Sequence, residues 1–179
     1  TELLDQARKV AAVVDIPIIS DIDDAGGTPL NAQRTTRLAE QAGLAAMHIE
    51  ALIPGKHFLG HKDRMCTKEQ AVDRIKAIVD ARTDPDFVII ARSDAINVST
   101  FNEAVERVNA YAEAGADLLF LPYLEPGDTK KAVDALSKPL LNVVIDTPRE
   151  QIEQAGLKVG IYPIQSLFVT YKAVRDMTR

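Results

Sequence analysis

The sequence predicts an α/β protein in which helices cover a parallel β-sheet. Short apolar runs alternate six times with longer segments whose apolar residues recur at helical spacing. The short runs are apolar almost throughout, which is typical of strands buried on both faces of a parallel sheet. The chain has 179 residues, 46% of them hydrophobic, so we assign residues 1–179 to a single domain with a substantial core.

The elements follow from these patterns in chain order. Strands are expected at residues 16–22, 45–50, 86–91, 117–121, 139–145 and 158–162. Helices are expected at residues 1–14, 31–42, 67–81, 100–114, 129–136, 147–154 and 164–178. Thr67 and Gln70 have the spacing of a capping box, and Gly43, Gly115 and Gly156 are expected to end helices. The first strand, with its run from Ile16 to Ile19, is expected to be buried.

Composition excludes several classes of protein. The net charge of −5 argues against a nucleic-acid partner, and no apolar run approaches the roughly 18 residues of a membrane span. No signal sequence is recognisable at the start. The one cysteine, Cys66, excludes an intrachain disulfide and favours a reducing compartment, so we expect a cytoplasmic protein.

Polar side chains gather where the first three predicted strands end. The pairs are Asp21 with Asp23, His48 with Glu50, and Arg92 with Asp94. The active rim of a (β/α)8 barrel has this layout, and an open doubly wound sheet would also place its site at these strand ends. The chain has no G-x-G-x-x-G motif and no P-loop, which disfavours a nucleotide site.

The acidic strand end predicts a metal site. Asp21 and Asp23 are two residues apart and therefore share one face of a strand. Carboxylates at a buried strand end are tolerable where a cation neutralises them, and an oxygen-only set suits a hard ion such as Mg²⁺, with Mn²⁺ as an alternative. The competing interpretation is an acidic turn in which Asp24 caps the following helix. Beside a metal, Asp24 is expected to bind the backbone of the glycine turn instead.

Five segments in register resemble the isocitrate lyase / phosphoenolpyruvate mutase superfamily over nearly the whole chain. They are Asp21–Gly27 (Asp-Ile-Asp-Asp-Ala-Gly-Gly), Asn31–Thr35 (Asn-Ala-Gln-Arg-Thr), Ala42–Glu50 (ending His-Ile-Glu), Ala91–Ala95 (Ala-Arg-Ser-Asp-Ala) and Tyr111–Asp117 (Tyr-Ala-Glu-Ala-Gly-Ala-Asp). The resemblance implies a (β/α)8 TIM barrel that begins with two further strands before Thr1, so about six βα units are expected here.

The same resemblance implies the roles of the site residues. Asp21, Asp23 and Glu50 would hold Mg²⁺ directly or through water. Arg92 would grip a substrate carboxylate, a task that suits a planar guanidinium. His48 and Asn142 match positions that line the substrate pocket. The implied substrates are small 2-oxo or 2-hydroxy acids, cleaved through an enolate that the metal stabilises.

The loop after Glu50 departs from the family. The cleaving lyases carry a catalytic cysteine in this loop and the mutases an asparagine, and the segment from Lys56 to His61 has neither residue. The segment from Pro54 to Gly60 looks closest to the oxaloacetate decarboxylase branch, so we expect a decarboxylase-like lyase in which Lys56, His57 and His61 are the catalytic candidates beside Arg92. A methylisocitrate lyase, a phosphonomutase and a non-catalytic relative remain the alternatives.

Several of these residues have a plainer explanation. His48 could be a core histidine, and the loop residues Lys56, His57 and His61 could simply be solvated. Asp94 is expected to brace Arg92, and Arg107 to lie on a solvated helix face. The family usually forms tetramers that exchange the last helix, so we expect a homotetramer with a small carboxylate as substrate and no nucleic-acid or membrane partner.

Overall fold

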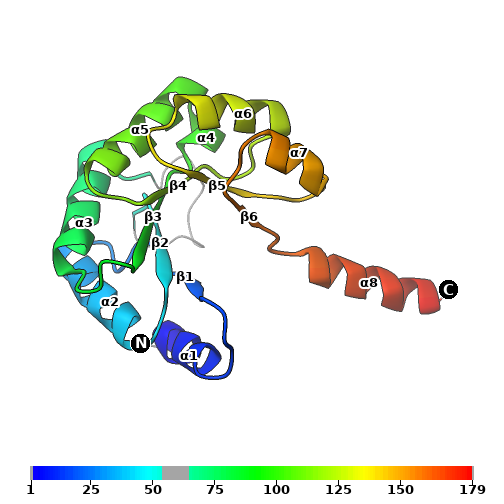
Figure 1. Ribbon diagram of the computed structural model, residues 1–179, viewed down its shortest axis with the longest axis horizontal. Coiled ribbons are helices and arrows are strands. Elements are labelled where there is room, and N and C mark those ends of the chain that lie inside the picture. Colours follow the sequence, from blue (N-terminus) through cyan, green and yellow to red (C-terminus); the bar gives the residue numbers. More distant parts are fainter. Residues whose placement is uncertain (1, 54–64, 179) are drawn as a thin grey trace.

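The computed structural model describes residues 2–53 and 65–178, which form one curled parallel sheet with helices along its outer side (Figure 1). The six strands lie in sequence order from β1 to β6, and every neighbouring pair is parallel. This confirms the predicted α/β class. The sheet curls as part of a TIM-type barrel, with no reversal of strand order of the kind that an open doubly wound sheet would have.

The strands are β1 (Ile19–Asp21), β2 (Ala46–Glu50), β3 (Val88–Arg92), β4 (Leu118–Phe120), β5 (Leu140–Val143) and β6 (Val159–Ile161). The helices are α1 (Glu2–Ala11), α2 (Pro29–Gln41), α3 (Lys68–Ala81), α4 (Ala95–Val98), α5 (Phe101–Glu113), α6 (Pro126–Ala135), α7 (Arg149–Gln154) and α8 (Gln165–Met177). The capping box of Thr67 and Gln70 opens α3 as predicted, and the Thr100 side chain caps α5.

Successive residues of a strand point to opposite faces of the sheet and enter two different cores. On the convex face, Met47, Ile89 and Leu119 pack against the helices in the larger core. On the concave face, Ile90 and Phe120 belong to a smaller cluster inside the curl. Residues on the concave face near the strand ends can therefore meet one another across the inside of the curl.

Beyond shifts of a few residues at other element ends, three differences from the prediction matter most. β1 is shorter than expected, and Ile16 and Ile19 are 68% and 43% exposed, so a buried first strand was wrong. Among the described strands β1 pairs with β2 alone, and Ile16 lies before β1, outside any strand. α6 begins at Pro126, a residue that fits the first turn of a helix, and the short helix α4 was not predicted.

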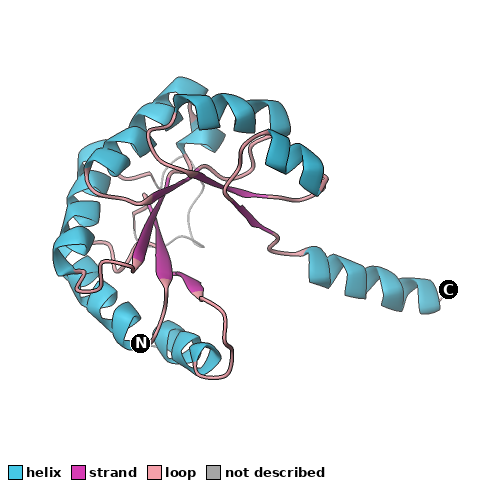
Figure 2. Ribbon diagram, in the orientation of Figure 1, coloured by secondary structure: helices cyan, strands magenta, loops and turns pink. Residues whose placement is uncertain are grey.

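The last helix, α8, extends away from the body of the protein (Figures 1 and 2) and has no buried residue. Its exposed apolar side chains are Leu167, Phe168, Val169, Tyr171, Val174 and Met177. Among the described helices, neither α8 nor any other is long and apolar enough to cross a membrane.

Candidate active site

A tight acidic turn follows β1 and connects it to β2. The Asp21 carboxylate accepts the N–H of Asp23 at 2.9 Å, and the Asp23 carbonyl accepts the N–H of Glu50 at 2.8 Å. Asp23 itself has a φ of +52°, which few residues other than glycine adopt. The Asp24 carboxylate accepts the N–H of Gly26 at 2.9 Å, so Asp24 binds the glycine turn as predicted. The competing interpretation, in which Asp24 caps the following helix, was wrong, because the Thr28 side chain caps α2.

The turn requires glycine at position 26. Gly26 has a φ of +86°, and a Cβ there would lie 2.8 Å from the Cβ of Asn31. The Asn31 side chain donates to the Gly26 carbonyl at 2.8 Å and so joins the turn to the start of α2. Strain and packing together explain why the acidic segment ends in glycine at this point.

Three potential metal ligands meet at the carboxyl ends of β1 and β2. Asp21, His48 and Glu50 each offer a donor atom, and these atoms all lie within 4.8 Å of one another. Strand pairing explains the meeting, because Asp21 is in register with His48 and Glu50 with Arg92. Two carboxylates and an imidazole, with His48 and Glu50 buried, are a donor set that fits a divalent cation.

This group of three contains His48 in place of Asp23, which was one of the three expected ligands. His48, predicted to line the substrate pocket, belongs to it, with Nε2 3.5 Å from Oδ2 of Asp21. Asp23, predicted as a ligand, does not. Its role toward a metal stays a prediction, and so does the role of His48 toward a substrate.

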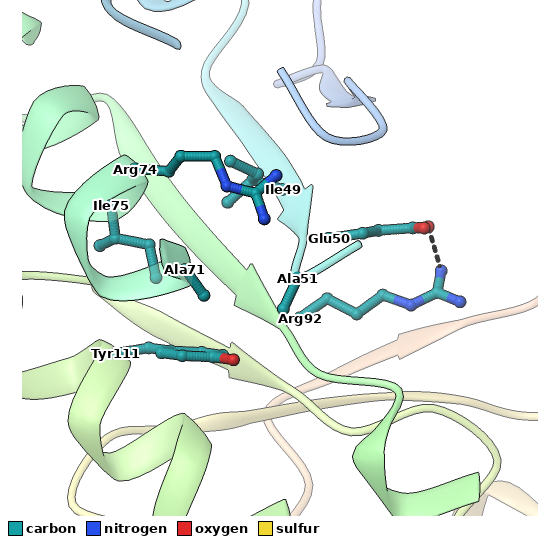
Figure 3. A pocket seen from close by; sticks show the side chains of 8 residues that line it. All are labelled: Ile49, Glu50, Ala51, Ala71, Arg74, Ile75, Arg92 and Tyr111. Carbon is teal, nitrogen blue, oxygen red and sulfur yellow. Dashed lines mark ion pairs between the residues drawn. The ribbon is translucent and has the colours of Figure 1, made fainter. Parts of the chain in front are cut away.

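Arg92 connects β3 to Asp21, His48 and Glu50, which together form the acidic cluster. Its Nη1 lies 2.7 Å from Glu50, whose side chain is fully buried (Figure 3), and its Nε and Nη2 donate to both oxygens of Asp94 at 2.9 and 2.8 Å. Burial lowers the pKa of Arg92, but the hydrogen bond and charge of Asp94, with the charges of Glu50 and Asp21, outweigh burial and raise it. Asp94 braces Arg92 as expected, and Arg92 is held as a permanent cation beside the acids.

Phe120 was missed by sequence reasoning and lies between two site residues. The Arg92 guanidinium carbon is 5.0 Å from the centre of its ring, and the His48 ring meets it edge-on at 5.5 Å and 79°. Register places Phe120 opposite Arg92. No sequence signal distinguished it from an ordinary apolar strand residue, because its contacts depend on the curl of the sheet.

Asn142 lies outside this cluster. It shares the convex side of β5 with Leu140, and its amide binds the backbone of Leu124, accepting from N–H at 3.2 Å and donating to the carbonyl at 2.9 Å. The amide also donates to the Thr129 hydroxyl at 3.3 Å. Asn142 thus holds the turn between β4 and α6, in which Tyr123 has a φ of +65°; substrate binding by Asn142 stays a prediction.

The remaining candidates divide into two sets. Lys56, His57 and His61 lie outside the described residues. Arg107 is not on a solvated face as predicted, because its side chain is only 13% exposed and donates to the Cys66 carbonyl at 3.2 Å. The helical spacing of its neighbours gave no indication that this side chain reaches the segment before α3.

Two acids, a histidine and an arginine gather at the carboxyl ends of the strands in this curled parallel sheet. TIM-barrel enzymes have this layout of the site. The comparison with protein families makes the class specific. The family model for phosphoenolpyruvate phosphomutase matches residues 1–179, and the chain belongs to this family. The resemblance inferred from the five segments is therefore confirmed.

Curated relatives include several named lyases. The chain is 36% identical to 2,3-dimethylmalate lyase of Eubacterium barkeri, over 99% of this chain and 64% of that protein. It is 35% identical to 2-methylisocitrate lyase of Escherichia coli (strain K12), over 98% and 62%. It is 34% identical to oxaloacetate decarboxylase of Rhodopseudomonas palustris (strain HaA2), over 98% and 65%. The chain thus spans somewhat less than two thirds of the length of these relatives.

Solved structures agree with this placement. Phosphoenolpyruvate phosphomutase from Streptomyces platensis subsp. rosaceus has a TM-score of 0.87 and 30% identity, covering 98% of this chain and 64% of that one. A phosphonopyruvate hydrolase in complex with oxalate and Mg²⁺ has a TM-score of 0.83 and 30% identity, covering 97% and 63%. The fold and the family are therefore established together.

Proposed function

We propose that this protein is a metal-dependent carbon–carbon lyase acting on a small 2-oxo or 2-hydroxy carboxylic acid. The observation that carries the proposal is the meeting of Asp21, His48 and Glu50 within 4.8 Å, with Arg92 directly beside Glu50. A cation and a guanidinium side by side suit a substrate that carries a carboxylate next to an oxo or hydroxyl group. The named lyases among the relatives support the same reaction class.

We propose Mg²⁺ as the cation, with Mn²⁺ as a substitute, held by Asp21, Asp23 and Glu50 and with His48 beside them. The carboxylate donors of the cluster favour a hard ion. When bound, the cation would polarise the 2-oxo group and favour the enolate that remains after carbon–carbon cleavage. The phosphonopyruvate hydrolase solved with oxalate and Mg²⁺ is a relative whose ligands match this chemistry.

Arg92 is proposed to bind the substrate carboxylate. Its bonds to Glu50 and Asp94 use Nε and one N–H on each terminal nitrogen. A guanidinium has five N–H donors, so one on each terminal nitrogen remains for a carboxylate. Asp94 fixes the plane of the guanidinium, and Phe120 supports it from one face. His48 is proposed to contact the substrate on the β2 side, and Asn142 is retained as a candidate contact.

We propose oxaloacetate decarboxylation as the first reaction to test. Decarboxylation needs a bound 2-oxo acid and a proton donor but not the cysteine of the cleaving lyases, and Cys66 is buried with its sulfur on the Arg74 guanidinium. Lys56, His57 and His61 are the candidates for proton transfer. A methylisocitrate lyase-type or phosphonomutase-type reaction is the alternative within the enzyme class.

The experiment assays oxaloacetate, methylisocitrate and phosphonopyruvate side by side, with Mg²⁺ and with chelator. We expect turnover of one of them that disappears with chelator and in Asp21→Ala. Mg²⁺ should also raise the melting temperature of the wild type and leave Asp21→Ala unchanged. A Mg²⁺ shift without turnover would favour a non-catalytic relative that binds metal and carboxylate, and absence of both effects would overturn the proposal.

We further propose a cytoplasmic homotetramer in which α8 packs on a second subunit. The support is the row of exposed apolar side chains along α8, because isolated exposed helices of this kind are unfavourable in water. Sedimentation of the protein tests the assembly. Replacing Leu167, Phe168 and Tyr171 with serine should shift it to monomers, and an unchanged assembly would contradict a role for α8.

A further inference from the structure

Arg74 is a charged residue on the apolar face of α3. It stands beside Ile75 and at helical spacing from Ala71 and Ile78, all of them buried, and Arg74 itself is only 2% exposed. A guanidinium is rarely buried to this extent unless its hydrogen bonds are satisfied. Its contacts therefore indicate what the residue does.

The Arg74 guanidinium joins three segments that are separate in sequence. Its Nη1 donates to the carbonyls of Leu52 at 3.0 Å and of Asp24 at 3.3 Å. Its Nη2 donates to the Cys66 sulfur at 2.6 Å. One planar group thus fixes the acidic turn after β1, the segment after β2 and the segment before α3 relative to one another.

Two of these three segments carry the proposed metal ligands. Asp24 belongs to the turn that Asp21 begins, and Leu52 lies two residues after Glu50. Figure 3 shows Arg74 on the side of β2 that faces α3, with the Glu50–Arg92 pair on the opposite side. Arg74 therefore holds the ends of β1 and β2 from behind the sheet, through the backbone carbonyls of Asp24 and Leu52.

We propose that Arg74 is a positioning residue that sets the distance between Asp21 and Glu50 and so determines the affinity of the site for a divalent cation. The inference rests on the proposed metal site and extends it to the helix layer. Removing the guanidinium leaves Asp21, Glu50 and the bond from Glu50 N–H to the Asp23 carbonyl in place. The carbonyls of Asp24 and Leu52, however, are no longer bound to a common group. Groups that orient metal ligands commonly change metal affinity by about 10- to 100-fold when they are replaced.

The experiment measures Mn²⁺ binding to the full chain by electron paramagnetic resonance of the free ion. Arg74→Met keeps much of the buried stem and removes the donors, so we expect the dissociation constant to rise about tenfold or more. Arg74→Lys keeps the charge but has no planar fork, so it should fall between Arg74→Met and the wild type.

A matched control separates positioning from general stability. Ile78→Ala creates a cavity on the same helix without touching the acidic turn. It should lower the melting temperature and leave the Mn²⁺ dissociation constant within about twofold of the wild type, since no metal-ligand segment is released.

The outcomes distinguish this inference from the proposed function. If the wild type binds no Mn²⁺, the metal site itself is wrong. If the wild type binds Mn²⁺ and folded Arg74→Met binds it equally well, the positioning role is wrong while the metal site stands. If neither Arg74 variant folds by circular dichroism, or if Ile78→Ala weakens binding as much as Arg74→Met does, the role of Arg74 is structural only and the inference is overturned.

Discussion

The two halves of the concave face differ sharply in chemistry although they belong to one sheet. Where β1 to β3 end, the inward-facing side chains are Asp21, His48, Glu50 and Arg92. The inward-facing residues of β4 and β5 are Leu118, Phe120, Leu141 and Val143. The backbone pairing is parallel in both halves, so the difference comes from side chains alone.

The polar half keeps its charges buried by pairing them, and the apolar half supplies the surface on which they rest. Glu50 is fully buried against Arg92, and Arg92 rests on the ring of Phe120. Substituting Arg92 in the polar half therefore removes the countercharge from beside two buried carboxylates, Glu50 and Asp94. A substitution in the apolar half removes packing or leaves a polar backbone group without a partner, which is a smaller effect.

The largest expected effect belongs to Arg92→Met. This substitution leaves Glu50 and Asp94 buried without their cation, so the free energy of unfolding should fall by about 3–5 kcal/mol. Urea unfolding of the metal-free protein measures the change. Activity should be lost as well, because the proposed carboxylate contact is removed.

A surface arginine serves as the control for Arg92. Arg149 pairs with Glu153 on α7, and the two side chains are 85% and 59% exposed. Arg149→Met should leave both stability and activity nearly unchanged, since exposed ion pairs contribute little. A stability loss for Arg92→Met no larger than that for Arg149→Met would break the distinction between the two halves.

The next effect belongs to Asn142→Leu, on the convex side of β5 behind the apolar half. The N–H and carbonyl of Leu124 both lose the amide that binds them, and Leu124 is buried, so unfolding should become easier by about 1–3 kcal/mol. Metal affinity should stay unchanged, since Asn142 binds no residue of the acidic cluster. Calorimetric titration with Mn²⁺ checks this, and a clear loss of affinity would show that the halves are coupled. A selective rise of KM would instead support the substrate contact predicted for Asn142.

Phe120→Leu tests the boundary between the halves. The variant loses the contact between the ring face and the Arg92 guanidinium, an interaction of about 1 kcal/mol, and releases the edge contact with His48. We expect KM for the 2-oxo acid to rise several-fold with a smaller change in kcat. Phe87→Leu is the matched control, because Phe87 is buried in the convex core. Equal KM changes in both variants would rule out a specific role for Phe120.

Sequence patterns were sufficient for the alternation of strands and helices and for the polar half of the site, and the family resemblance favoured the barrel order of the strands. Parallel strands bring their carboxyl ends to one edge, so the spacing of the polar pairs at positions 21, 48–50 and 92–94 was enough to place them together. Asp24 and Asp94 were also assigned correctly, because their bonds reach groups only two residues away. Local bonds of this kind are visible in the sequence.

Long-range contacts were not predictable in the same way. Whether Asn142 faces the inside or the outside of the curl depends on the register of β5, and a shift of one residue reverses the face. Arg74 carried a usable signal, because it is a charge at an apolar position of an amphipathic helix. Phe120 carried none, and Ile16 is exposed because the strand begins only at Ile19, so Ile16 lies outside the sheet.

The smallest expected effect concerns Cys66 and alkaline pH. Burial raises the pKa of the Cys66 thiol, and the nearby charges of Arg74 and Arg107 offset this only in part. The unfolded chain releases the thiol proton near its ordinary pKa of about 8.5, whereas the folded chain retains it to higher pH. The stability that the protonated Cys66 thiol contributes to the folded state is therefore fully present below about pH 8.5. It is lost as the pH rises through the folded pKa, because the unfolded state then binds fewer protons.

Comparing the wild type with Cys66→Ala isolates this contribution from that of Tyr111, whose pKa burial also raises. Between about pH 8.5 and 9.5 the wild type should lose up to about 1 kcal/mol more stability than the variant, measured by urea unfolding at each pH. Parallel pH curves would mean that the thiol titrates alike in both states. Cys66 would then be as free to ionise as an exposed thiol, and its contact with Arg74 would have to offset the effect of burial completely.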